Sequence, residues 1–166
     1  MYLIRRLTLM LMLQGCLLFP SGECIAMEKG DNPPDIYGYT LDNEYFRLSS
    51  LLAPMVVSFF SVTCLPCRYE LPELAKLENR YPNISFVAVH VDYTDISMND
   101  IKAFINSLKG SPARIISSGS IVMDDYDIKA LPYTVVLDKE GYIHSTQHGY
   151  KKNETIEELE MLLSEL

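Results

Sequence analysis

The sequence contains no cluster of basic residues. Its 14 Lys and Arg residues face 22 Asp and Glu residues, and nowhere are more than two basic residues adjacent. The formal net charge is therefore −8. Proteins that bind nucleic acids or anionic membrane surfaces carry basic patches that pair with phosphate groups. We therefore expect this chain to bind neither.

Histidine is scarce, with only three residues in the chain. A structural zinc site needs about four ligands. His144 and His148 lie four residues apart on a predicted strand, which separates them by roughly 13 Å, too far for one tetrahedral metal. His90 falls inside another predicted strand, where we expect it to be packed or hydrogen-bonded. We therefore expect no metal ion, and no other cofactor.

Cysteine is scarce too, and two of the four cysteines lie near the N-terminus. We interpret residues 1–26 as a signal peptide. Arg5 and Arg6 precede an apolar stretch, residues 7–19, that is too short to span a bilayer comfortably. Cys24-Ile25-Ala26 is an acceptable small-residue cleavage site.

Two alternatives for the N-terminus remain open. The sequence "LQGC" resembles a bacterial lipoprotein box, with Cys16 as the lipidated residue, and the apolar stretch could also remain as an uncleaved membrane anchor. All three interpretations predict a periplasmic or otherwise extracytoplasmic location, and the mature chain from residue 27 would carry a charge of −9, with 12 basic and 21 acidic residues. In the folded part only Cys64 and Cys67 remain, fewer than an exported protein with several structural disulfides would have.

Strands and helices alternate along the rest of the chain. The polar segment 27–35 is interpreted as a linker, and residues 36–166 as one domain. The predicted elements are a hairpin (36–40 and 45–48), a strand (55–62), a helix (64–81), a strand (84–92), a helix around 101–108, a short strand (113–116), a short helix (121–128), a hairpin (133–138 and 142–148) and a terminal helix around 159–166. This order predicts an α/β sheet with both faces covered.

The cysteine pair follows the apolar strand 55–62 and opens the predicted helix. Thiol–disulfide exchange requires one exposed thiolate and a second thiol that resolves the mixed disulfide. Cys64 would lie at the helix N-terminus, where backbone amides and the helix dipole favour the thiolate. Cys67, one turn further, would be more buried. Leu65 supplies no charge, and Pro66 restricts the spacer.

Glu70 lies three residues after Cys67 and therefore on the same helix face. By itself this spacing favours a solvated surface acid. The alternative is a carboxylate beside Cys67 that would raise the pKa of its thiol and exchange protons with it.

Two stretches of the sequence resemble one family. "SFFSVTCLPCRYELPEL" (58–74) and "IKALPYTVVLDKEGYI" (128–143) are similar to the two signatures of the thioredoxin-like TlpA/ResA family of exported thiol–disulfide oxidoreductases. The resemblance implies a thioredoxin-like fold, in which a central mixed β-sheet is flanked by helices and carries an N-terminal β-hairpin and a central αβ insertion. It covers roughly residues 33–166.

The resemblance also implies roles for individual residues. Cys64 and Cys67 would be the redox-active pair, and Glu70 would occupy the position of the active-site glutamate. Pro132 would be a cis-proline facing the disulfide, and Leu131 would line the substrate groove. The residues around the first cysteine that would contact substrate are Thr63, Leu65 and Pro66. Thr63 stands where the family usually has Trp, and this chain has no Trp at all.

The predicted function is therefore reduction of disulfides in client proteins. Its electrons would come from a membrane-bound donor, and maturation of cytochrome c is one use of such proteins in this family. Two alternatives remain: a non-catalytic thioredoxin-fold binding module and a copper-handling assembly factor. Copper delivery uses a three-residue spacer between the cysteines, whereas this chain has two residues there. A peroxidase of the peroxiredoxin type is disfavoured because Val57 occupies the place of the required proline.

Several acidic residues, among them Asp92, Asp100 and Asp124, fall in predicted loops and helix ends. We expect them to be solvated charges. The alternative is that they repel acidic partners and select basic ones.

Overall fold

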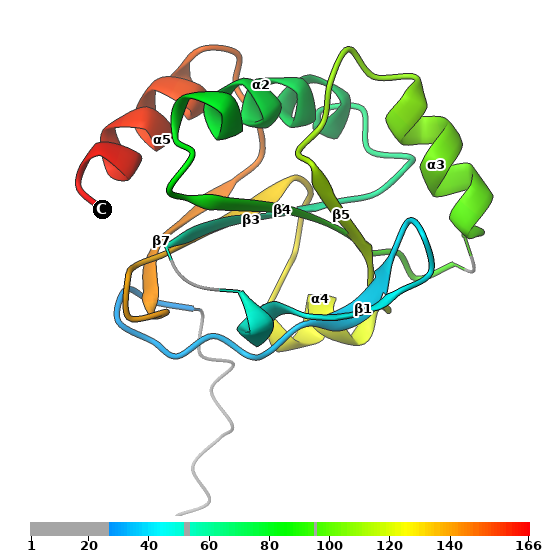
Figure 1. Ribbon diagram of the computed structural model, residues 1–166, viewed down its shortest axis with the longest axis horizontal. Coiled ribbons are helices and arrows are strands. Elements are labelled where there is room, and N and C mark those ends of the chain that lie inside the picture. The colour runs from blue at the N-terminus through cyan, green and yellow to red at the C-terminus, as the bar shows by residue number, and fades with distance from the viewer. Residues whose placement is uncertain (1–26, 52–53, 95) are drawn as a thin grey trace, which may run out of the picture.

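The computed structural model describes residues 27–51, 54–94 and 96–166 (Figure 1). The predicted signal peptide, its cleavage site and Cys16 all belong to residues 1–26, which lie outside the described residues. Within the described ranges, no helix combines the length and the apolar character needed to cross a membrane.

The elements follow one another in the predicted order. They are β1 (Tyr37–Thr40), β2 (Tyr45–Arg47), the short 3-10 helix η1 (Leu48–Ser50), β3 (Met55–Phe60), α2 (Cys67–Arg80), β4 (Ser85–His90), α3 (Met98–Asn106), β5 (Arg114–Ser117), α4 (Ile121–Asp125), β6 (Tyr133–Leu137), β7 (Ile143–His148) and α5 (Glu154–Ser164). The strands form one sheet in the order β2-β1-β5-β4-β3-β6-β7. The neighbours β3, β4 and β5 are parallel, and all the other pairs are antiparallel.

β3 is the strand that positions the cysteine pair. All six of its residues are buried, as its almost continuous apolar sequence predicts for a central strand covered on both faces. It pairs with β4 on one side and with β6 on the other. The loop that follows β3 therefore starts from a fixed point in the middle of the sheet.

Helices cover the two faces of the sheet unequally. Figure 1 shows α2, α3 and α5 over one face and α4 under the other. Because side chains alternate along a strand, Val56 and Phe60 of β3 enter the core under α2, whereas Val57 and Phe59 enter the core that includes Tyr126, which follows α4. The predicted mixed sheet with flanking helices and an N-terminal hairpin is present.

Several predicted helix limits are wrong, among them the end of α4, which lies at Asp125 and not at residue 128. α2 begins at Cys67, three residues later than predicted, and it runs through Pro72 to Arg80. Pro66 is its N-cap residue, and residues 64–66 form the turn that precedes it. α3 ends at Asn106, before the predicted limit at residue 108.

The segment 27–35 contains no helix or strand, and it lies against the sheet. The N–H of Gly30 donates to the carbonyl of Ile143 (2.7 Å), and the N–H of Ile143 donates to the carbonyl of Asp31 (2.9 Å). These two bonds attach the segment to β7.

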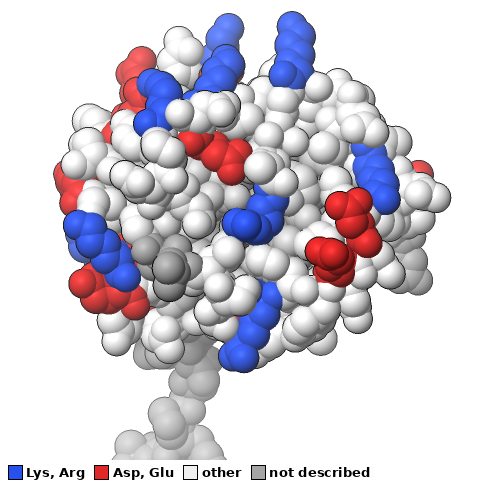
Figure 2. Space-filling view, in the orientation of Figure 1, with Lys and Arg blue, Asp and Glu red and all other residues white. Residues whose placement is uncertain are grey.

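The surface reflects the charge pattern of the sequence. On the face drawn in Figure 2, basic and acidic side chains are interspersed among uncharged ones, and no basic patch covers it.

Candidate active site

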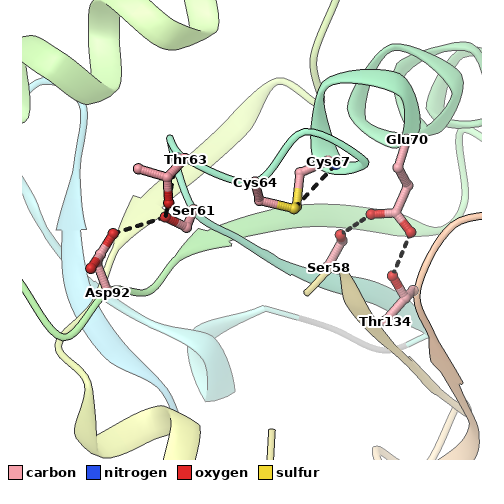
Figure 3. The surroundings of a disulfide bond; sticks show 8 residues. All are labelled: Ser58, Ser61, Thr63, Cys64, Cys67, Glu70, Asp92 and Thr134. Carbon is pink, nitrogen blue, oxygen red and sulfur yellow. Dashed lines mark hydrogen bonds between the residues drawn. A yellow bond between two sulfur atoms is a disulfide. The ribbon is translucent and has the colours of Figure 1, made fainter. Parts of the chain in front are cut away.

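Cys64 and Cys67 form a disulfide with a Cα–Cα distance of 5.4 Å (Figure 3). Cys64 lies in the turn after β3 and is partly exposed, whereas Cys67 opens α2 and is fully buried. The predicted order of exposure is thereby confirmed. An incoming sulfur atom can reach Cys64 from solvent and cannot reach Cys67.

The N-terminus of α2 points at the sulfur of Cys64. The N–H of Cys67 donates to Sγ of Cys64 at 3.2 Å. Helix N-termini carry unpaired amides and a partial positive charge, which favour an anion. If the disulfide is reduced, this arrangement stabilises a thiolate at Cys64. Pro66, which has no N–H, occupies the N-cap without leaving another donor unpaired.

Three side chains around Cys64 are exposed. Thr63 precedes it, and Leu65 and Pro66 follow it. The Leu65 side chain is 63% exposed, which is high for a large apolar residue next to a reactive sulfur. These residues surround the accessible sulfur.

Glu70 is buried behind the disulfide, with 1% of its surface exposed. Its carboxylate accepts hydrogen bonds from Ser58 Oγ (2.7 Å) and from Thr134 Oγ1 (3.1 Å), as Figure 3 shows. Burial raises its pKa to about 7, and the two hydrogen bonds oppose part of that rise. The solvated surface acid favoured by spacing alone is therefore wrong, because this face of α2 packs onto the sheet.

Sequence reasoning missed Ser58 and Thr134. The two residues are direct partners across β3 and β6, so they share one face of the sheet. Each is the single Ser or Thr of its strand, among apolar and aromatic residues. Such residues were a usable signal, because a buried hydroxyl requires a hydrogen-bond partner.

The Leu131–Pro132 peptide bond is cis, as predicted. Pro132 immediately precedes β6, whose first residue, Tyr133, pairs with Phe59 near the carboxyl end of β3. Leu131 and Pro132 therefore lie at the same edge of the sheet as the turn that carries Cys64. The N–H of Gly149 donates to the carbonyl of Pro132 at 2.8 Å, which attaches this loop to the end of β7.

A second polar group lies on the other side of Cys64. Ser61 Oγ donates to Asp92 Oδ2 at 2.8 Å and lies 3.0 Å from the hydroxyl of Thr63 (Figure 3). Although partial burial raises the pKa of Asp92, hydrogen bonds from Ser61 and Thr94 outweigh it and hold the pKa below its usual range. Asp92 is thus a partly exposed loop carboxylate, as predicted, and it is also hydrogen-bonded beside the disulfide turn.

The histidines lie apart from one another. His90 packs edge-on against Phe60, with ring centroids 5.5 Å apart, and its buried Nε2 has no hydrogen-bond partner among the described residues. Burial lowers its pKa, and the Asp92 carboxylate opposes this only in part. Across residues 27–51, 54–94 and 96–166, no three His, Cys, Asp or Glu side chains are grouped so that they could hold a metal ion.

Comparisons with known proteins agree on one family. The family model described as Redoxin matches residues 28–163. The sporulation thiol-disulfide oxidoreductase A of Bacillus subtilis (strain 168) is 26% identical over 157 residues, which are 93% of this chain and 95% of that protein. The thiol-disulfide oxidoreductase ResA of Bacillus thuringiensis (strain Al Hakam) is 24% identical over 163 residues, which are 93% of this chain and 92% of that protein.

A solved structure shows the same fold. The putative thiol:disulfide interchange protein DsbE from Chlorobium tepidum superposes with a TM-score of 0.72 at 20% identity, covering 84% of this chain and 98% of that one. The predicted thioredoxin-like fold and the resemblance to ResA are both confirmed.

Proposed function

We propose a function for this chain from two premises: it belongs to the Redoxin family, and it is a thiol–disulfide oxidoreductase. Our proposal is that it reduces disulfides in client proteins outside the cytoplasm. Cys64, Cys67 and Glu70 would be the reacting groups. The observation that carries the proposal is a buried carboxyl group, Glu70, behind a cysteine pair of which only the first is accessible.

The first step is attack by the Cys64 thiolate on a client disulfide. The N-terminus of α2 supports this role, because the Cys67 N–H already points at Cys64 Sγ. One client sulfur bonds to Cys64, and the other leaves as a thiolate. The product is a mixed disulfide between the two proteins, and the transfer of two electrons to the client is completed only in the second step.

The second step uses Cys67 and Glu70. The Glu70 carboxylate takes the proton of the Cys67 thiol, and the new thiolate attacks Sγ of Cys64. The second client sulfur leaves as a thiolate and is protonated, so the client gains two electrons and this chain ends with the Cys64–Cys67 disulfide. A pKa of about 7 populates both forms of Glu70 near neutral pH, as a general acid–base group requires.

The reducing direction is inferred from the residues between the cysteines. Leu65 and Pro66 add no positive charge to the stabilisation that the helix N-terminus gives Cys64. A less stabilised thiolate makes a more reducing couple, so we expect a potential nearer to about −270 mV than to about −120 mV. A dithiol donor must then regenerate the reduced form, and we propose a membrane-bound one.

Client binding is assigned to the residues that surround Cys64. Leu131 and Pro132 would hold the extended client chain on one side, and Thr63, Leu65 and Pro66 would contact it beside the sulfur. Their position at one edge of the sheet and the exposure of residues 63, 65 and 66 support this assignment.

The domain organisation and the client remain part of the proposal. Residues 1–26 would export the chain as a signal peptide, or anchor it through a lipid on Cys16. Residues 27–35 would link them to the domain, 36–166. Cytochrome c apoprotein is one client that the resemblance to the TlpA/ResA family implies. A periplasmic reductase of this kind would keep the haem-binding thiols of the apoprotein reduced.

Reduction of insulin with dithiothreitol as the electron source tests the enzyme against a non-catalytic binding module. We expect the parent protein to accelerate precipitation of the insulin B chain and Cys64→Ser to lose that acceleration. If Cys64→Ser matches the parent, the enzyme proposal is wrong. Cys67→Ser is the matched variant, because it should retain the attack and accumulate the mixed disulfide. Identifying the trapped partner in cells then reports client and direction together.

A further inference from the structure

A small cavity lies beyond β4, on the side of β3 opposite β6 and Pro132. The parallel strands β3, β4 and β5 end at the same edge of the sheet. Cys64 follows the first, Asp92 and Tyr93 follow the second, and residues 118–120 follow the third. The cavity lies between the loops after β4 and β5 and has a volume of about 280 Å³. Crevices outside the carboxyl ends of parallel strands are where α/β sheets bind ligands.

The cavity is connected to the redox site by hydrogen bonds. Asp92, one of its lining residues, accepts the Ser61 hydroxyl at 2.8 Å. Ser61 in turn lies 3.0 Å from Thr63, the residue before Cys64. A client chain that brings its sulfur to Cys64 therefore has its neighbouring side chains within reach of Asp92. Typical small-molecule sites measure roughly 300–1,000 Å³, so this smaller cavity suits a single side chain.

The lining of the cavity favours a cation. Asp92 is negatively charged, and within the described part of the chain no Lys or Arg forms an ion pair with it. Tyr93 beside it is 69% exposed, and an open aromatic ring attracts ammonium and guanidinium groups. His90 contributes a neutral ring to the wall, since burial lowers its pKa. Of these side chains only Asp92 carries a charge, and that charge is negative.

We propose that this cavity, through Asp92 and Tyr93, binds a lysine or arginine side chain that lies near the reacting cysteine of the client. This inference rests on the proposed function, and it adds a chemical preference to it. Thr63 supports this network, because its hydroxyl lies 3.0 Å from Ser61 Oγ and its backbone N–H donates to the same atom at 3.3 Å. The cavity therefore selects among clients and takes no part in sulfur exchange.

Three disulfide-bonded peptides test the proposal. They are identical except for the residue two positions from the cysteine, which is Lys, Gln or Glu. The measured quantity is the kcat/KM for their reduction by the full reduced chain. We expect the Lys peptide to exceed the Glu peptide by about two- to fivefold, the size expected for one partly exposed ion pair, and the ratio to shrink with added salt.

Two variants and one control test whether Asp92 and Tyr93 cause the preference for the Lys peptide over the Glu peptide. Asp92→Asn should bring the Lys-to-Glu ratio close to one, and Tyr93→Ala should lower it without disturbing the Ser61 hydrogen bond. Asp42→Asn removes the same charge from the exposed turn between β1 and β2, and it should leave the ratio unchanged. A ratio that survives Asp92→Asn and Tyr93→Ala, or that falls equally in Asp42→Asn, overturns the proposal. If even the Gln peptide is not reduced by the parent, the failure is that of the proposed function instead.

Discussion

The hydroxyl of Ser58 donates a 2.7 Å hydrogen bond to the carboxylate of Glu70 in the interior of the protein. The bond joins β3 to α2, the two elements on either side of the disulfide turn. Thr134 of β6 donates to the second oxygen of the same carboxylate. Glu70 is thereby oriented by two strands of the sheet, and the properties of its carboxyl group depend on this packing.

The charge on Glu70 makes stability depend on pH. Its pKa is about 7 in the folded protein, against an ordinary value of 4.5. Between these values the folded state binds more protons than the unfolded state, so the free energy of unfolding falls as pH rises. The stabilising contribution is complete below pH 4.5 and is lost above pH 7. Relative to Glu70→Gln, we expect the oxidised parent to lose about 3 kcal/mol over this window.

Urea unfolding of both oxidised proteins at a series of pH values measures this difference. The Gln side chain does not titrate, so Glu70→Gln serves as the reference for all other groups. If the free energies of unfolding of the two proteins change in parallel from pH 4 to pH 8, the pKa of Glu70 is not raised.

The hydrogen bond from Ser58 lowers the pKa of Glu70, because it stabilises the charged form. We therefore expect Ser58→Ala to move that pKa further above 7, by about one unit. NMR titration of the labelled Glu70 carboxyl carbon gives the midpoint directly. Ser85→Ala, at the start of β4, is the matched control and should leave the midpoint in place. An unchanged midpoint in Ser58→Ala would contradict the assigned role of the hydroxyl.

Alanine variants of Leu71 and Leu65 distinguish an effect on the packing of the core from an effect on client binding. Leu71 on α2 is fully buried, whereas Leu65 is 63% exposed. Leu71→Ala should lower the free energy of unfolding by about 2–5 kcal/mol through cavity formation. Leu65→Ala should change it by less than about 0.5 kcal/mol. Denaturant unfolding checks both values. Leu65→Ala should slow insulin reduction. If it changes only the stability and not the rate of insulin reduction, Leu65 does not contact the client.

Leu65 also provides a test of the redox direction. A histidine at this position, Leu65→His, would place a cationic side chain beside Cys64 and stabilise its thiolate. We expect the reduction potential to rise by about 30 mV or more, which is a tenfold change in the equilibrium constant. Equilibration with glutathione mixtures measures it. Tyr69→His, on an exposed position of α2, is the control and should shift the potential little. A parent potential near about −120 mV would overturn the reducing direction.

The main elements were predictable because their signals are local. The apolar run of β3 requires a central strand, and the leucines of α2, which recur every three residues, require a helix with one buried face. Gly141, which has a φ of 88°, fits the turn expected between β6 and β7. The helix start was predicted less well, because both Cys64 and Cys67 are compatible with a first turn.

The sequence by itself determined the redox pair, its order and its place at a helix N-terminus, since a two-residue spacer and a following helix are properties of consecutive residues. Tertiary structure decided the state of Glu70, because its burial depends on how α2 packs on β3 and β6, and its partners Ser58 and Thr134 lie 12 and 64 residues away in the chain. It also decided the role of Asp92, which the parallel pairing of β3 and β4 brings next to Ser61, 31 residues away. Burial and long-range pairing set these electrostatic properties, and neither is encoded in local spacing.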